Sequence, residues 1–101
     1  MNIKDYEAYV ESRCQSYVDL PYLVVALNEE AGEVAGWFKK FVLRANPTGL
    51  LSQLDLKSEL GDVLFYLTRL ANHFGWSLED IMDYNKEKLD RRVTSKIRSV
   101  V

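Results

Sequence analysis

The chain has 101 residues, which fits one domain spanning 1–101 and leaves no room for a second. Hydrophobic residues make up 48% and charged residues 28%, a globular rather than a disordered balance. The net charge of -2 gives no general attraction to nucleic acid or to acidic membranes, and the single cysteine excludes an internal disulfide. Because no apolar run could span a bilayer and no signal peptide is evident, we expect a cytoplasmic protein without nucleic-acid or membrane partners.

The first half of the chain predicts two helices. Apolar and aromatic residues recur at helical intervals over residues 3–17, which favours a first helix there. Asp19 followed by Leu20 and Pro21 is typical of a helix start, so a second helix is expected over 20–44. The Asn-Pro-Thr-Gly cluster at 46–49 predicts a loop.

The second half predicts two more helices. Ser52 or Asp55 is a candidate cap for a third helix that continues to Phe74 and ends at Gly75. The sequence from Ser77 to Asp80 resembles a capping box, and it opens a fourth helix expected to continue to about residue 92. Since no alternating strand pattern is present, the prediction is an all-α fold, a compact four-helix bundle.

The acidic residues of the second helix lie unusually close to its apolar stripe. If Glu30 is placed at zero on a helical wheel, Leu23 and Phe41 lie at about 20° and Val34 at about 40°. Glu33 lies at about 300°, at the edge of the same stripe. Glu30 therefore occupies a position where an amphipathic helix ordinarily carries an apolar side chain.

The third helix repeats this feature beside a long apolar stripe, which consists of Leu60, Val63, Leu64, Leu67, Leu70, Ala71 and Phe74. Relative to Glu59, Leu70 lies at about 20°, Tyr66 at about 340° and Asp62 at about 300°. Glu59 and Asp62 are three residues apart on one margin of the apolar stripe, so both can reach one point in space. Tyr66 is a candidate hydrogen-bond partner of a carboxylate at this point.

Several ionised carboxylates near a core need compensation. Two such charges about 5 Å apart repel by roughly 3 kcal/mol at an effective dielectric constant near 20. Protons, arginine or lysine partners, or a hard cation can remove this cost, and an all-oxygen ligand set suits Mg²⁺, with Mn²⁺ as a substitute. An acid pair at this spacing also occurs on solvated helix faces, so the wheels alone leave both interpretations open.

A family resemblance favours the metal site. Glu29-Glu30-Ala31-Gly32-Glu33 followed by Glu59-Leu60-Gly61-Asp62 resembles the EExxE…ExxD signature of the all-α nucleotide pyrophosphohydrolases, which include MazG-like proteins. The stretch from Asn85 to Arg92, NKEKLDRR, is similar to the NxxKLxxR pattern of MazG-like members. The three motifs occur in the expected order on successive predicted helices.

The resemblance implies hydrolysis of a nucleoside triphosphate to the monophosphate and pyrophosphate. Carried over by position, Glu30, Glu33, Glu59 and Asp62 would hold Mg²⁺. Glu29, the first acid of the motif, would bind a further metal ion, orient water or act as the general base. Family members usually assemble, so a homodimer or a dimer of dimers is expected.

The fourth helix would contribute the substrate-binding groups. Asn85, Lys88 and Arg92 share one face with the apolar residues of this helix, and their side chains suit contacts with phosphate oxygens. A basic edge that merely extends into solvent would have the same pattern.

Two other functions remain open at this point. A phosphoribosyl-ATP pyrophosphatase would carry the same acidic motif, although the MazG-like Asn85-x-x-Lys88-Leu89 pattern favours the first interpretation. A non-catalytic helical dimerisation module would have no use for four intact acidic positions. Removal of unwanted nucleotides from the pool is the role that the resemblance implies.

Overall fold

The computed structural model describes residues 1–14, 19–43 and 50–100, with side chains described over 1–14, 19–43 and 53–93. Its helices are α1 (Ile3–Arg13), α2 (Leu20–Phe38), the short π-helix η1 (Lys39–Leu43), α3 (Leu50–His73) and α4 (Leu78–Val100). No strand occurs in these ranges, so the all-α prediction is confirmed.

The first two helices begin where local side chains satisfy their free N–H groups. The backbone N–H of Asp5 donates to the side chain of Asn2 over 2.8 Å, which caps α1. Asp19 caps α2 by accepting from the N–H of Tyr22 over 3.1 Å, and Pro21 lies in the first turn. The predicted start of the second helix is confirmed.

The turn between α3 and α4 is also fixed by short-range contacts. Gly75 has a φ of +79°, a left-handed conformation that glycine adopts without a Cβ clash. Ser77 and Asp80 form a reciprocal capping box. The N–H of Asp80 donates to Ser77 Oγ over 3.0 Å, and the N–H of Ser77 donates to Asp80 Oδ2 over 2.9 Å.

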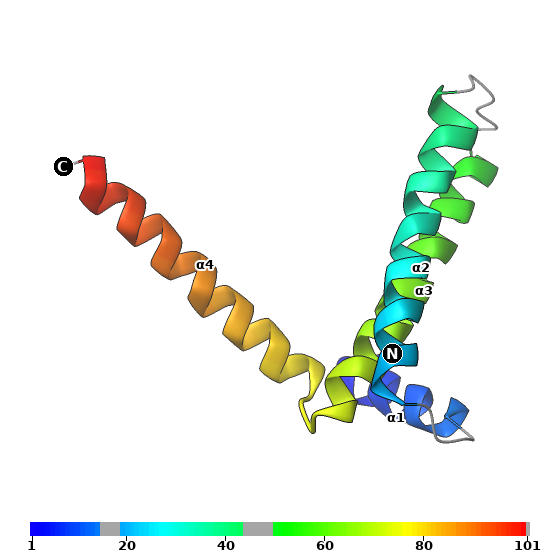
Figure 1. The fold of residues 1–101 in the computed structure, drawn as a ribbon, viewed down its shortest axis with the longest axis horizontal. Helices are drawn as coiled ribbons and strands as arrows, with labels where there is room; N and C mark the ends of the chain where they lie inside the picture. Colours follow the sequence, from blue (N-terminus) through cyan, green and yellow to red (C-terminus); the bar gives the residue numbers. More distant parts are fainter. Residues whose placement is uncertain (15–18, 44–49, 101) are drawn as a thin grey trace.

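Helices α2 and α3 run side by side in opposite directions, and α1 crosses them near one end (Figure 1). All four α-helices and η1 contribute to the small buried core. Its members are Val10, Leu23, Ala26, Phe41, Ala71 and Leu78, together with the polar Thr68, whose hydroxyl donates to the Leu64 carbonyl over 2.7 Å. This arrangement holds α2 and α3 in the register that forms the site.

Helix α4 leaves the other helices after its first turns and projects away from the α2–α3 pair (Figure 1). The radius of gyration is 17.3 Å, whereas a compact domain of this length has one near 13 Å. The four predicted helices are present, but within one chain they do not close into the compact bundle expected from sequence. The physical reason is that α4 has few contacts with α1 and α3, and most of its length extends away from them (Figure 1).

Several helix boundaries differ from the predictions. Helix α1 ends at Arg13, and the predicted extension to Tyr17 lies outside the described residues. Helix α2 changes to a π-helix at Lys39, and the predicted end at Arg44 and the 46–49 loop are likewise not described. Helix α3 already begins at Leu50, so Ser52 and Asp55 lie inside it and do not cap it.

Some apolar positions expected in the core of α3 are exposed in the single chain. Leu60 is 52% exposed, and Leu64 and Phe74 are also exposed. Phe74 stacks on Trp76 with ring centroids 5.0 Å apart, whereas Leu60 and Leu64 leave an apolar surface on α3 open to solvent.

Candidate metal centre

Three carboxylates from two helices converge midway along the α2–α3 pair. One oxygen each of Glu30, Glu59 and Asp62 can be chosen so that all three lie within 4.8 Å of one another. Glu30 comes from α2, whereas Glu59 and Asp62 are one turn apart on α3. Glu30 and Glu59 are half-buried and Asp62 is exposed, so the cluster opens toward solvent on one side.

Glu30 shows the electrostatic effect of this convergence. Burial, and then the negative charges of Asp62, Glu29, Glu59 and Glu33, raise the pKa of the Glu30 carboxyl above its ordinary value. A cation placed among these carboxylates would offset both effects, because it attracts each charge and replaces lost hydration.

The other two predicted acids lie at the edge of the cluster. Glu33 is exposed and is not one of the three mutually close carboxylates, although its charge acts on Glu30. Glu29 is exposed as well, and its charge also raises the pKa of Glu30. The structure therefore brings three of the four predicted ligands together, and the role of Glu33 as a ligand stays a prediction.

Two tyrosines, Tyr66 on α3 and Tyr6 on α1, are close enough to the carboxylates for their pKa values to be affected. Burial, a hydrogen bond with Tyr22 and the charges of Tyr22 and Glu30 raise the pKa of Tyr66, while Arg69 lowers it. Tyr66 was expected beside Glu59, but the charge of this cluster that acts on its hydroxyl is that of Glu30.

Tyr6 of α1 was not anticipated. Burial, then Tyr9 and then Asp62 raise the pKa of the Tyr6 hydroxyl, which places a phenol from α1 close enough to feel the Asp62 charge. Sequence spacing could not reveal this neighbour, because it depends on how α1 crosses α3.

The predicted substrate-binding residues are not at the carboxylates of their own chain. Asn85, Lys88 and Arg92 are exposed on α4, which projects away from the α2–α3 pair (Figure 1). Asn85 and Lys88 instead line a hollow of about 570 Å³ together with Trp76, Asp80, Ile81 and Tyr84. Neighbouring positions on one helix put Asn85 and Lys88 together, but no described contact joins them to the acidic cluster.

The fold and the site together define an all-α protein with a cluster of three carboxylates that could hold a metal ion. A family model described as the MazG nucleotide pyrophosphohydrolase domain matches residues 21–95. The chain belongs to this family. The match begins in the first turn of α2, so α1 lies outside it.

Two similar proteins cover most of the chain. The Gene 37 protein of Mycobacterium phage L5 is 39% identical over 82 residues, which are 78% of this chain and 70% of that protein. The uncharacterized protein YvdC of Bacillus subtilis (strain 168) is 37% identical over 79 residues, 71% of this chain and 74% of that protein. No solved structure matches the chain.

One further finding concerns membranes. Within the described ranges, none of the helices combines the length and the apolar character needed to span a bilayer.

Proposed function

We propose that this chain is a Mg²⁺-dependent hydrolase that cleaves nucleoside or deoxynucleoside triphosphates between the α- and β-phosphates, releasing the monophosphate and pyrophosphate. Membership of the MazG nucleotide pyrophosphohydrolase family supports the reaction class. The observation that carries the proposal is the convergence of Glu30, Glu59 and Asp62 within 4.8 Å.

The donor set fits the proposed ion. Carboxylate oxygens from two helices, without a thiolate or imidazole among the three, are the ligands that Mg²⁺ and Mn²⁺ prefer. Bound Mg²⁺ would neutralise phosphate charge and lower the pKa of a bound water. Glu33, one turn beyond Glu30, would complete the ligand set, and Glu29 would orient the attacking water or accept its proton.

The side chains on α4 would hold the polyphosphate. Asn85 can donate hydrogen bonds to phosphate oxygens, and Lys88 and Arg92 supply positive charge. Because these groups lie away from the carboxylates of their own chain, a complete site requires α4 of another copy or a different position of α4. We favour a homo-oligomer, either a dimer or a dimer of dimers, because a single chain exposes more surface than a compact monomer does.

A single chain exposes too much surface for a compact monomer. Its accessible surface is 7999 Å², whereas a folded monomer of 11.7 kDa exposes about 5,900 Å². The excess of about 2,100 Å² is the amount that a substantial interface buries. The exposed apolar residues available for this include Val24 and Val25 on α2, Leu60 and Leu64 on α3, and Met82, Leu89 and Val93 on α4.

The physiological role that fits this chemistry is the removal of unwanted nucleotides from the pool, which would place the protein in the cytoplasm. The names of the two similar proteins state no substrate, so base and sugar preference must come from experiment.

Pyrophosphate release from a panel of canonical and modified triphosphates, with phosphoribosyl-ATP included, tests the proposal. The proposal predicts release by the wild type only with Mg²⁺ or Mn²⁺, and loss of release in Glu59→Gln. Glu11→Gln, an exposed acid on α1, is the control and should retain activity. Release that persists in Glu59→Gln, or no release from any triphosphate, would contradict the proposal. Light scattering after size exclusion measures the assembly, and a monomer at micromolar concentration would contradict the oligomer.

A further inference from the structure

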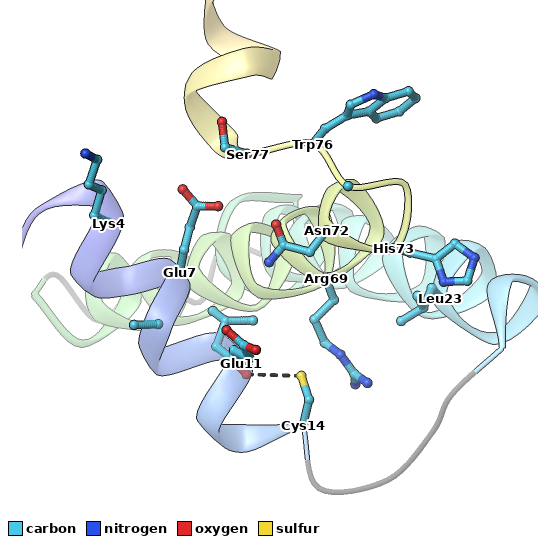
Figure 2. A pocket seen from close by; sticks show the side chains of 13 residues that line it. Lys4, Glu7, Glu11, Cys14, Leu23, Arg69, Asn72, His73, Trp76 and Ser77 are labelled. Carbon is cyan, nitrogen blue, oxygen red and sulfur yellow. Dashed lines mark hydrogen bonds between the residues drawn. The ribbon is translucent and has the colours of Figure 1, made fainter.

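A groove of about 750 Å³ lies where α1, the end of α3 and the α3–α4 turn meet. Figure 2 shows Glu7 on α1 directed toward Ser77 at the start of α4, while Glu11 lies further along α1. The groove therefore lies at the joint between α4 and the rest of the chain.

Glu7 forms a hydrogen bond across this joint. The backbone N–H of Leu78, the first residue of α4, donates to Glu7 Oε2 over 3.3 Å, although the two residues are 71 positions apart. The capping box already satisfies the N–H groups of Ser77 and Asp80, so Glu7 supplies an acceptor that the local sequence does not. A carboxylate at this end of a helix also interacts favourably with the helix dipole.

Few other contacts fix the direction of α4. Leu78 is buried and Ile81 is half-buried, whereas Met82 and Leu89 are exposed. The first turn of α4 therefore determines the direction of the rest of that helix. Within the described part of the chain, the bond from the Leu78 N–H to Glu7 is the hydrogen bond that joins α1 to this turn.

We propose that Glu7 is a positioning residue: by holding the N-terminus of α4, it sets the direction in which α4 presents Asn85 and Lys88 to the nucleotide. The link to the nucleotide rests on the proposed function. Glu7 lies outside residues 21–95, which the family model matches, whereas Leu78 lies inside them. Without the Glu7 carboxylate, α4 samples other directions. The apparent affinity for the nucleotide then falls in proportion to the fraction of chains in which α4 has the binding-competent direction.

The direction of α4 can be measured independently of activity. Spin labels at Lys57→Cys on α3 and Glu87→Cys on α4, both exposed positions, report the α3–α4 distance in a Cys14→Ser background. Dilution with unlabelled chains restricts the signal to pairs within one chain. Glu7→Ala should shift and broaden the distance distribution, Glu7→Gln should do so less because its amide oxygen still accepts, and Glu11→Ala should match the wild type.

Kinetics test the consequence for substrate. Glu7→Ala should raise KM for the best triphosphate by about tenfold, near the lower end of what a hydrogen bond to a charged group contributes, because the 3.3 Å bond is long. It should leave kcat and the stabilisation by Mg²⁺ unchanged, because the carboxylate cluster is intact. A variant that merely lost stability would not separate KM from kcat in this way.

The outcomes are distinguishable. Equal distance distributions in Glu7→Ala and Glu11→Ala overturn the positioning role, and an unchanged KM in an active protein overturns its link to substrate. If Glu7→Ala does not fold, as judged by circular dichroism, the milder Glu7→Gln decides by the same criteria. If the wild type releases no pyrophosphate, the proposed function and the kinetic half of the inference both fail, while the distances still decide whether Glu7 orients α4.

Discussion

Removal of the Glu30 charge should stabilise the metal-free protein, although it would damage a metal site. At a separation of 4.8 Å, two carboxylates repel by about 3.5 kcal/mol at an effective dielectric constant of 20 and by about 0.9 kcal/mol in water. Glu30 and Glu59 are half-buried and Asp62 is exposed, so the true value lies between these limits. Glu30→Gln should raise the free energy of unfolding by about 1–3 kcal/mol, and so raise Tm by at least about 4 °C.

Mg²⁺ should reverse this order of stability. An ion at one hundred times its Kd would stabilise the wild type by about 2.7 kcal/mol, whereas Glu30→Gln, with a weakened site, would gain much less. Thermal unfolding in EDTA and in Mg²⁺, at one fixed chain concentration, measures both effects, with Glu11→Gln as the surface control. The reasoning fails if Glu30→Gln is no more stable than the wild type in EDTA, or if Mg²⁺ stabilises the two proteins equally.

Three further predictions concern pH, substrate and the α3–α4 turn. The pKa of the Glu30 carboxyl is raised above its ordinary value of 4.5 in the folded protein. At pH values between 4.5 and this raised pKa, the folded metal-free protein therefore binds more protons than the unfolded chain. Urea unfolding should therefore show stability falling, and Mg²⁺ titration should show affinity rising, as pH increases through this window; flat profiles would contradict the assignment. Lys88→Ala should raise KM roughly tenfold while the Mg²⁺-dependent shift in Tm persists, and loss of that shift would show that Lys88 acts on the metal site. Gly75→Ala should cost about 1–2 kcal/mol in urea unfolding, because φ is +79° there, and an unchanged midpoint would count against the strain argument.

The helix ends that sequence predicts well are those determined by neighbouring residues. Asp19 and Ser77 cap helices through groups three residues away, and Gly75 relieves strain at its own backbone. The start of α3 was misplaced because Ser52 and Asp55 are good caps that also tolerate a helix interior. Leu50 and Leu51, which precede them, favour continuing the helix toward its N-terminus.

In the candidate site, too, the sequence predicts what neighbouring residues determine and misses what depends on the packing of the helices. The i, i+3 spacing fixes Glu59 and Asp62 on one edge of α3, and the wheel correctly turns Glu30 away from full solvent exposure. The register between α2 and α3 decides that Glu30, and not Glu33, is the α2 acid within 4.8 Å of both. Tyr6 depends on the crossing of α1, which no local pattern encodes. An apolar stripe also does not indicate whether the surface that covers it belongs to the same chain. For this reason, α4 was expected to close a bundle within one chain.

The weak attachment of α4 has a consequence for its own helical order. Beyond its first turns the 23-residue helix has few tertiary contacts, so it depends on local interactions such as the exposed Lys86–Asp90 ion pair of 2.8 Å. Such an exposed i, i+4 pair adds little to helix stability, and isolated helices in water are marginal. The C-terminal turns of α4 should therefore exchange their amide hydrogens rapidly in a dilute chain and slowly in an assembled one. Helix content in α4 would then vary with protein concentration, and a coil-to-helix transition in this segment would accompany each association event.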